Sequence, residues 1–360
     1  MNRRMFMKIR FIEREVLKER PDQNALGFGK YFTDYMFMMD YTTEKGWHDA
    51  RIIPYGPIQL DPSMAVLHYA QETFEGLKAY RRNDGNVQLF RPEMNARRMM
   101  KSNERLCMPK VPEDIFIEAL KALVSVEKDW VPSLEETSLY IRPFVYANEV
   151  ALGVHPAASY QFVIILSPVG EYYKEGMSPI KIWVEDEFVR AVKGGTGFAK
   201  CGGNYAGGLA AQSKANQAGY AQVLWLDGNE KKYVEEVGSM NIMFLIDDEI
   251  VTAPIDGTIL PGITRDSLIH ILKDWGYKVS ERRLSIDELM EAARTKRLKE
   301  AFGTGTAAVI APIGELSYKN EQVQINNFET GELTQKIYDE LTGIQWGKIK
   351  DSYGWTVEVK

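Results

Sequence analysis

The sequence predicts a mixed α/β protein of the α+β kind, organised in two domains. Its 360 residues exceed the usual size of a single hydrophobic core. Runs of β-branched and aromatic residues alternate with stretches in which apolar residues recur at helical spacing. The segment SPVGEYYKEGMSP (167–179) combines proline, glycine and charge, which is the composition of an interdomain linker. We therefore expect a smaller domain over 1–166 and a larger one over 180–360.

The first domain is predicted to contain a β-hairpin, two helices and two further strands. The segments 68–82 and 86–92 are strand-like and flank an Asn-Asp-Gly turn, which is a strong hairpin signal. Pro92 then begins a helix through about Leu106, because proline is tolerated at the first helical position. Apolar spacing predicts a second helix over about 113–130. The two strands that follow are TSLYIRPFVYA and SYQFVIIL.

The second domain is expected to begin near Ile180 and to be rich in strands. A helix of small residues is predicted around 206–218, and Pro261-Gly262 leads into another helix with apolar residues at helical spacing. Ser285 and Glu288 form a capping box, so a further helix begins there. The predicted strands are IKIWVE, AQVLWLD, KKYVEEVGSMNIMFLI and AFGTGTAAVIAPIG.

Composition limits the classes of partner and the compartment. The chain has 44 Lys+Arg against 50 Asp+Glu without blocks of like charge, which argues against a nucleic-acid surface and favours a small-molecule partner. Cys107 and Cys201 are the two cysteines, too few for a disulfide framework or a metal cluster, so a reducing compartment is expected. The start lacks the unbroken apolar core of a signal peptide, and the apolar run 162–166 is too short to span a membrane. We expect a cytoplasmic protein.

One lysine, Lys200, lies among seven glycines in GGTGFAKCGGNYAGG (194–208). A phosphate-binding Walker A loop requires glycine before the lysine and serine or threonine after it, but Ala199 and Cys201 occupy these positions. GTGTAA (303–308) resembles a dinucleotide motif, yet a strand-like segment follows it where a helix is required. A nucleotide-binding protein is therefore a distant alternative.

A cysteine nucleophile and a reactive lysine are the other possibilities for this loop. Nothing local supports Cys201 as a nucleophile, so a small packed residue is the preferred interpretation. The amine is the better candidate, because a lysine held at low dielectric forms a Schiff base with an aldehyde. By residue type alone, a surface lysine in a flexible loop is an equally good interpretation.

Five further motifs resemble one known family. KCGGNYAGG, QVLWLDG, EEVGSMN, LPGITRDS and FGTGTAA, in this order and spacing, are similar to the branched-chain aminotransferases of the fold-type IV pyridoxal-phosphate enzymes. HYAQETFEGLKAY and SLYIRPFVYANEVALGVHP match the same family, so the similarity covers nearly the whole chain beyond about the first 20 residues. The resemblance implies the two-domain fold-type IV architecture and pyridoxal 5′-phosphate as cofactor. It also implies transamination between L-leucine, L-isoleucine or L-valine and 2-oxoglutarate, giving branched-chain 2-oxo acids and L-glutamate.

The resemblance assigns roles to residues that would hold the cofactor. It implies that Lys200 forms the Schiff base and then moves the substrate Cα proton, and that Glu236 faces the pyridine nitrogen. Tyr205 matches the phenol that hydrogen-bonds the cofactor O3′. Matching phosphate-binding positions are Arg98, Ile263, Thr264 and Thr306; of these, the N–H groups of Ile263 and Thr264 stand at a helix start.

Two neighbouring residues could be confused with members of this set. The spacing before KSNERLC places Arg98, and not Arg97, in the family motif. Because successive side chains of a strand point to opposite faces, Glu235 must point away from Glu236, and we expect Glu235 to be solvated.

The same resemblance implies a substrate pocket and a homodimer. Matching substrate positions are Tyr69, Phe74, Tyr140, Arg142, Val154, Tyr172 and Lys78, with the N–H groups of Thr306 and Ala307 near the carboxylate. Val154 belongs to a loop that family members insert into the neighbouring subunit's site. Some members carry a Cys-x-x-Cys pair where this chain has Ala308 and Ala311, so no thiol switch is expected there, and no metal is expected. The D-amino-acid aminotransferases, the nearest alternative, and the aminodeoxychorismate lyases share the fold type.

Overall fold

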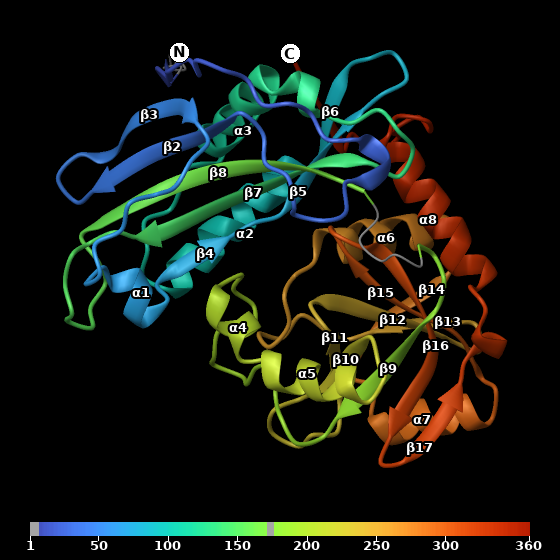
Figure 1. The fold of residues 1–360 in the computed structure, drawn as a ribbon. Coiled ribbons are helices and arrows are strands. Elements are labelled where there is room, and N and C mark those ends of the chain that lie inside the picture. The colour runs from blue at the N-terminus through green and yellow to red at the C-terminus, as the bar shows by residue number, and fades with distance from the viewer. Residues whose placement is uncertain (1–6, 171–175) are drawn as a thin grey trace, which may run out of the picture. The chain divides into compact units, whose positions relative to one another are not determined.

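The computed structural model describes residues 7–170 and 176–360, which form two compact units (Figure 1). The first unit holds 7–170 together with Ala199–Gly202 and Ile344–Lys360, and the second holds 176–198 and Gly203–Gly343. The division expected from the sequence assigned the last two segments of the first unit, 199–202 and 344–360, to the second domain. Backbone pairing explains the C-terminal difference, because strand β18 (Thr356–Val359) is hydrogen-bonded to strand β6 (Val87–Phe90).

The first unit is built on one largely antiparallel sheet. Its strand order is β1-β3-β2-β8-β7-β5-β6-β18, with β4 paired to β7 and with β1 and β3 parallel. The predicted hairpin is confirmed, since β5 and β6 pair antiparallel across the Asn-Asp-Gly turn. The other strands are β1 (Arg10–Phe11), β2 (Tyr35–Thr42), β3 (Gly46–Pro54), β4 (Glu72–Phe74), β5 (Leu77–Arg81), β7 (Ser138–Ala147) and β8 (Ser159–Val169).

Helices α2 (Pro92–Arg105) and α3 (Glu113–Val126) cover one face of this sheet. α2 begins with proline in its first turn, as predicted, and α3 has acidic residues in its first turn, where the helix dipole favours negative charge. The buried apolar side chains of α3, including Phe116 and Leu120, pack with Phe162 of β8. The opposite face of the sheet does not take part in this core.

Two predicted boundaries in the first unit are wrong. The strand expected over 68–82 is a short helix, α1 (Ala65–Tyr69), followed by the separate strands β4 and β5; Ala70 in the left-handed conformation ends the helix. The helix expected to reach Trp130 ends at Val126, and the chain continues as a 3-10 turn (Lys128–Trp130). A second 3-10 turn, Gln23–Ala25, lies near the start.

The second unit contains a sheet that closes on itself. The strands run in the order β11-β10-β9-β16-β15-β12, and β12 pairs back with β11. β13 and β14 extend the sheet beyond β12, and β17 pairs with β16. Their bounds are β9 (Ile180–Glu185), β10 (Gln222–Leu226), β11 (Val234–Val237), β12 (Met240–Ile246), β13 (Glu249–Thr252), β14 (Lys278–Glu281), β15 (Leu298–Gly305), β16 (Val309–Tyr318) and β17 (Glu321–Gln324).

Two of the long strands predicted here are hairpins. The segment 231–246 is divided into β11 and β12, with Gly238 at a positive φ of 56° between them. The segment 301–314 is divided between β15 and β16 by a tight turn at 306–308. Apolar residues continue through both turns, so hydrophobic pattern alone did not reveal them.

Helices α4 to α8 complete the chain, together with a 3-10 turn at Asn326–Phe328. The predicted helix start is confirmed, because the Ser285 hydroxyl accepts the N–H of Glu288 at 3.1 Å. The Glu288 carboxylate pairs with Arg282, so the second hydrogen bond of a capping box is not formed by it. α8 receives its N-terminal cap from a strand, since the Glu300 carboxylate accepts the N–H of Thr334 at 2.8 Å. Their bounds are α4 (Gly202–Ala206), α5 (Leu209–Gln217), α6 (Ile263–Asp274), α7 (Ile286–Arg294) and α8 (Glu332–Gln345).

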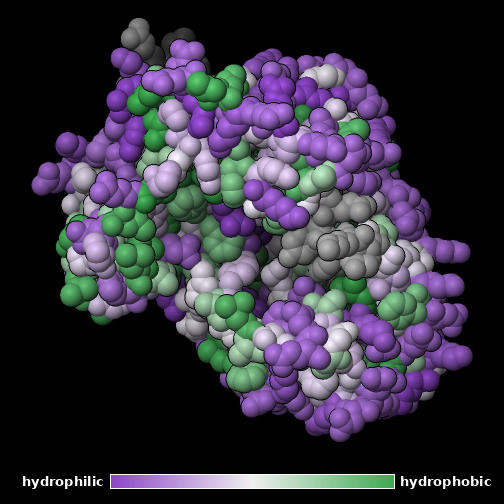
Figure 2. Space-filling view, viewed as in Figure 1, coloured by the Kyte–Doolittle hydropathy of each residue, from purple (hydrophilic) through white to green (hydrophobic). Residues whose placement is uncertain are grey.

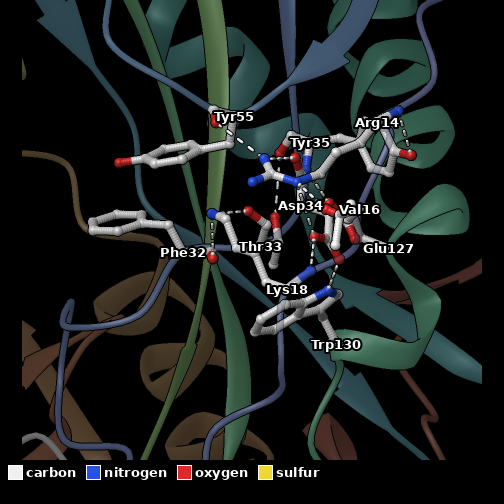
Figure 3. Close-up of polar contacts among 10 residues, drawn as sticks. All are labelled: Arg14, Val16, Lys18, Phe32, Thr33, Asp34, Tyr35, Tyr55, Glu127 and Trp130. Carbon is white, nitrogen blue, oxygen red and sulfur yellow. Dashed lines mark hydrogen bonds and ion pairs between the residues drawn. The ribbon is translucent and has the colours of Figure 1, made fainter.

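A buried polar network ties the N-terminal segment to the first unit (Figure 3). Asp34 is 3% exposed and accepts the N–H of Lys18 at 2.7 Å and the indole N–H of Trp130 at 2.8 Å. Lys18 Nζ donates to the carbonyls of Phe32 and Thr33. Figure 3 also shows Glu127 beside this group, where its carboxylate accepts the backbone N–H of Tyr35.

Burial raises the pKa of Glu127 to about 7, from its ordinary value of 4.5. The Tyr35 N–H, the Thr33 hydroxyl and Lys18 oppose the rise, whereas the charge of Asp34 adds to it. Because the folded chain prefers the protonated carboxyl, this group favours folding fully below pH 4.5, and its contribution is lost as the pH rises through about 7. The loss amounts to on the order of 3 kcal/mol.

The substitution Glu127→Gln should remove this pH dependence, because glutamine keeps the carbonyl acceptor and stays neutral. We expect the variant and the wild type to melt at similar temperatures in acid, and the variant to melt higher above neutral pH. Thermal melting across that range measures the difference. Asp129→Asn is the control, because Asp129 is exposed and pairs with Arg20. A constant difference between Glu127→Gln and wild type at every pH would contradict the prediction.

Candidate active site

Lys200 is held by its backbone within the first unit. Its N–H donates to the Ser102 hydroxyl at 2.9 Å, and its carbonyl accepts the N–H of Phe74 at 3.0 Å. The N–H of Gly202 is bound by the carboxylate of Glu72. Lys200 Nζ lies 4.8 Å from the centre of the Phe74 ring. The backbone at Lys200 is thus hydrogen-bonded to residues of β4 and α2. This argues against the interpretation, left open by the sequence, that Lys200 lies in a flexible surface loop.

Close approach explains two glycines of this loop. A Cβ at Gly202 would lie 2.2 Å from Glu72 Oε1, and a Cβ at Gly197 would lie 2.1 Å from the carbonyl oxygen of Thr258. Neither distance is possible for a real Cβ. At Gly197 the obstacle is backbone, so this position needs glycine, whereas at Gly202 a Cβ would displace the carboxylate that binds the Gly202 N–H. Gly203 differs, because a Cβ there would meet nothing within 4 Å. Cys201 is 4% exposed, as expected of a small packed residue.

Arg98 is fixed by a buried carboxylate that was not predicted from the sequence. Glu75 is fully buried and accepts two hydrogen bonds from Arg98, Nε to Oε1 at 2.8 Å and Nη2 to Oε2 at 2.7 Å. Asn95, one turn earlier on α2, donates to the same carboxylate at 2.8 Å. This two-point pairing fixes the plane of the guanidinium, which lysine could not reproduce. The sequence did contain one signal for this carboxylate. Glu75 is a charged residue in the segment FEG, which lies between two apolar strands.

Tyr140, Arg142 and Phe74 come together on the sheet face opposite α2 and α3. Arg142 donates to the Tyr140 hydroxyl at 3.1 Å and lies 4.7 Å from the centre of the Phe74 ring. The Nε of Arg142 is buried and has no acceptor among the described residues. Lys78 is the cross-strand partner of Tyr140, and burial lowers the pKa of Lys78 to about 8 against the charge of Glu136. The result is a cationic and aromatic surface suited to an anionic ligand.

Tyr69 and Val154 lie in an exposed apolar region of the first unit. The Tyr69 hydroxyl donates to the carbonyl of Leu152, which joins the end of α1 to the loop between β7 and β8. Val154 is 80% exposed and Leu152 is 64% exposed. Figure 2 shows hydrophobic surface gathered over these elements. Tyr172, the remaining predicted substrate residue, lies outside the described residues.

Glu236 is the centre of the candidate site in the second unit. Its Oε1 accepts the N–H of Leu260 at 3.0 Å and the side-chain amide of Asn241 at 3.1 Å. Its Oε2 lies 2.9 Å from Nε of Arg190. Both ionic side chains are buried. Arg190 was not predicted from the sequence, because it lies four residues before the glycine-rich segment and has no local motif.

The start of α6 is joined to Glu236 through Asn241. A Cβ at Gly262, the residue before the helix, would lie 1.9 Å from the Asn241 side chain. Ile263 and Thr264 form the first turn of this helix of 12 residues, where backbone N–H groups lack intrahelical acceptors and attract anions. The Gly262 N-cap provides no side-chain cap.

Thr306 and Ala307 lie in the turn that follows β15. β15 is the neighbour of β12, and its Thr304 is the cross-strand partner of Asn241. The Thr304 hydroxyl is buried and has no partner among the described residues. Glu236, Asn241 and Thr304 therefore form one cross-strand row. Thr306 lies two residues after Thr304, in the turn beyond β15.

Tyr205 lies on α4, whose position is fixed by the residue before it. Asn204 accepts a hydrogen bond from the Thr196 hydroxyl at 2.7 Å and donates to the Thr196 carbonyl at 2.8 Å. Tyr205 itself is 36% exposed. Thr196 belongs to the glycine-rich segment, so the segment and Tyr205 are positioned together.

The expectation that Glu235 is solvated is wrong. Its side chain is 7% exposed and lines a small pocket with Thr258, Ile259 and Ala253. Glu235 does point away from Glu236 as strand alternation requires, but the loop 253–259 covers that face of β11 too. The sequence pattern gave no indication that both faces of this strand are covered.

The described residues contain neither a candidate membrane span nor a candidate metal centre. Over 7–170 and 176–360, no helix has both the length and the apolar character needed to cross a membrane. In the same ranges, no three side chains of histidine, cysteine, aspartate or glutamate are placed to hold a metal ion.

The chain matches known proteins over most of its length. Residues 72–316 match the family model described as amino-transferase class IV. Branched-chain-amino-acid aminotransferase 2 of Bacillus subtilis (strain 168) is 59% identical over 342 residues, which cover 95% of this chain and 94% of that protein. Branched-chain-amino-acid transaminase 1 of the same organism is 56% identical over 354 residues, 97% of this chain and 99% of that protein.

Solved structures agree with these relatives. The Escherichia coli branched-chain amino acid aminotransferase has a TM-score of 0.75 and 27% identity, and the match covers 91% of this chain and 99% of that chain. A second enzyme of the same name, from T.th. and solved with pyridoxamine 5′-phosphate, has a TM-score of 0.75 and 26% identity, with 93% and 99% covered. The chain therefore belongs to the branched-chain-amino-acid aminotransferases, a family of the class IV aminotransferases with the fold-type IV architecture.

The geometry of the glycine-rich segment leads to a test of local stability. Gly197→Ala should destabilise the protein by about 2 kcal/mol or more, because its Cβ would overlap the Thr258 carbonyl and displace a buried loop. Gly203→Ala is the matched control, since it adds a methyl group to open space within α4. Thermal melting of both variants measures the difference. Equal melting temperatures for the two variants would contradict the assigned close approach.

Proposed function

We propose that this chain catalyses amino transfer between L-branched-chain amino acids, namely leucine, isoleucine and valine, and 2-oxoglutarate, with pyridoxal 5′-phosphate as cofactor. The observation that carries the proposal is the fixed position of Lys200, whose backbone is hydrogen-bonded to Ser102 and Phe74, with the N–H of Gly202 bound by Glu72. The named relatives support the substrate class and favour it over D-amino acids. The similar T.th. enzyme was solved with the amino form of this cofactor.

The residues present fit such a cofactor. When bound, pyridoxal phosphate supplies an aldehyde that accepts an amino group and a ring that accepts electrons. Lys200 would provide the amine that reacts with the aldehyde. Glu236 would provide the negative charge that faces the ring nitrogen, and Tyr205 would provide the hydroxyl that hydrogen-bonds O3′. The phosphate would be held by Arg98, the N–H groups of Ile263 and Thr264, and the hydroxyl of Thr306. Two features support this set: the unsatisfied first turn of α6 and the fixed guanidinium of Arg98.

Lys200 would also act as the base in the reaction. Its amine would take the proton from the substrate Cα and return a proton on the other side of the transfer. A base in this role needs a constant position, and the backbone hydrogen bonds of Lys200 supply it. The contact of its Nζ with the Phe74 ring would restrict the remaining side-chain freedom.

The aromatic and cationic surface would receive the substrate side chain. Phe74, Tyr140, Tyr69, Val154 and Tyr172 would form apolar walls, with the N–H groups of Thr306 and Ala307 near the carboxylate. Arg142 and Lys78 would lie at the same pocket. The buried Nε of Arg142 supports a polar ligand there, since an unsatisfied buried donor costs about 1–3 kcal/mol.

We further propose a homodimer in which the loop carrying Val154 enters the partner's site. The support is the exposed apolar group formed by Leu67, Tyr69, Val150, Leu152 and Val154. Side chains of this kind clustered on a soluble chain mark an interaction surface. A cytoplasmic location is proposed from the exposed thiol of Cys107, and cell fractionation would test it.

Replacement of Lys200 tests the proposed function. Lys200→Ala should lower the rate of L-leucine transamination with 2-oxoglutarate by about 10⁴-fold or more, since both the amine and the base are removed. Coupled assay of glutamate formation measures it, and borohydride reduction followed by mass spectrometry should locate the cofactor on Lys200 in the wild type. Turnover of D-alanine in place of L-leucine would support the D-amino-acid alternative and contradict the proposal.

Sedimentation equilibrium tests the dimer. The wild type should have twice the mass of one chain, and Leu152→Asp should shift the population toward single chains, because a buried charge without a partner opposes association. Gly203→Ala, outside the apolar group, is the control. A wild-type mass equal to one chain would contradict the homodimer.

A further inference from the structure

Asn241 is a buried polar residue to which the proposed reaction gives no role. It lies on β12 and is 4% exposed. Its amide nitrogen donates to Glu236 Oε1 at 3.1 Å and to the carbonyl of Leu260 at 3.0 Å. Both partners are acceptors, so the two N–H groups of the amide are used and the nitrogen must face them. The orientation of this side chain is therefore determined by its contacts.

Two further contacts close this group around one carboxylate oxygen. The N–H of Leu260 donates to the same Glu236 Oε1 at 3.0 Å. Glu236 and Asn241 are directly opposite each other in the paired strands β11 and β12. The oxygen is therefore bound both from the neighbouring strand and from the segment that precedes α6. Moving either of them would break a hydrogen bond of a buried carboxylate, which is costly.

The other end of the amide lies against the residue that precedes α6. A Cβ built on Gly262 would lie 1.9 Å from Asn241 Oδ1. Asn241 thus contacts the backbone on both sides of Pro261, at the Leu260 carbonyl and at Gly262. Proline has a fixed φ, so the segment between these contacts has little freedom of its own. One side chain of β12 therefore holds the backbone at the point where α6 begins.

The two places that Asn241 joins are assigned to opposite ends of the cofactor. Glu236 would face the ring nitrogen, and the first N–H groups of α6, at Ile263 and Thr264, would bind the phosphate. The ring and the phosphate of this cofactor are joined through one methylene group, so their separation varies little. Both ends bind well only if the protein holds its two subsites at a matching separation.

We propose that Asn241 is a positioning residue that keeps the carboxylate of Glu236 and the anion-binding start of α6 at the separation that the cofactor requires. The inference rests on the proposed function, because it concerns the same site. In this role Asn241 acts through Glu236 and through the backbone of 260–262.

Arg190 also contacts Glu236 but does not duplicate this role. Its Nε is 2.9 Å from the other carboxylate oxygen, Oε2. Its Nη2 donates to the carbonyls of Gly197, at 3.1 Å, and Thr258. Arg190 thus joins the carboxylate to the glycine-rich segment and to the loop at 258, whereas Asn241 joins it to the turn that leads into α6.

The test compares a ligand that occupies both subsites with ligands that occupy one. Pyridoxine 5′-phosphate carries the ring and the phosphate but has no aldehyde, so it binds without reacting with Lys200. Pyridoxine and inorganic phosphate each provide one end. Asn241→Ala should weaken the binding of pyridoxine 5′-phosphate to the apoprotein about tenfold, the scale of one or two lost hydrogen bonds. Binding of the two fragments should change by less than about twofold, because each needs only its own subsite.

Isothermal titration calorimetry measures all three affinities. Gly262→Ala is a second variant that leaves β12 unchanged, and its Cβ would push the Asn241 amide away from its partners. It should give the same pattern, and it decides alone if Asn241→Ala does not fold.

Thr252→Val is the matched control. The Thr252 hydroxyl is buried and donates at 2.7 Å to the carbonyl of Ile242, the residue after Asn241. This variant therefore loses a buried hydrogen bond to β12 without a change at either subsite. It should melt at a lower temperature than the wild type and bind all three ligands equally well.

The outcomes separate the inference from the proposed function. Equal weakening of all three ligands by Asn241→Ala, or no weakening, would overturn the positioning role and leave the aminotransferase proposal intact. A wild-type apoprotein that binds pyridoxine 5′-phosphate no better than inorganic phosphate would overturn the proposed function itself. Selective loss of the ligand with two ends is the result we expect.

Discussion

The site depends on how the backbone of Lys200 is held. A reactive amine must keep its position while its bonds change, and a side chain with four rotatable bonds does not keep it unaided. Three hydrogen bonds from Ser102, Phe74 and Glu72 fix the peptide groups at 200–202. The glycine at 202 allows the carboxylate of Glu72 to approach this closely. Gly197 and Gly202 thus lie in close contact with neighbouring groups, whereas a Cβ at Gly203 would meet nothing within 4 Å.

Charged groups in both units follow one physical rule, in which a buried ion is fixed by a partner of opposite charge. Glu75 binds Arg98 at two points, and Arg190 contacts Glu236. Such pairs add little net stability, because the cost of desolvation offsets the attraction. They do fix the position and orientation of the charged side chain. A site that recognises an anionic cofactor and an anionic substrate benefits from charged side chains held in a fixed orientation.

The sequence predicted the class of fold and several local elements better than the contacts that surround the candidate residues. The hairpin before Pro92, the helix α2 and the N-cap at Ser285 depend on local signals, and the structure has all three. The tight turns after Val237 and Gly305 interrupt apolar runs, so periodicity could not reveal them. Glu75 and Arg190 act through partners distant in sequence, and Glu235 is buried by a loop about 20 residues away. Local patterns carry no information on such contacts.

The pairing of β18 with β6 has a consequence for synthesis on the ribosome. β18 follows the second unit in the chain, so β6 lacks this partner until the second unit has been synthesised. Until then one edge of β6 presents unpaired peptide groups, which invite pairing with other chains. Ribosome-bound intermediates that lack β18 are therefore expected to depend on chaperone protection.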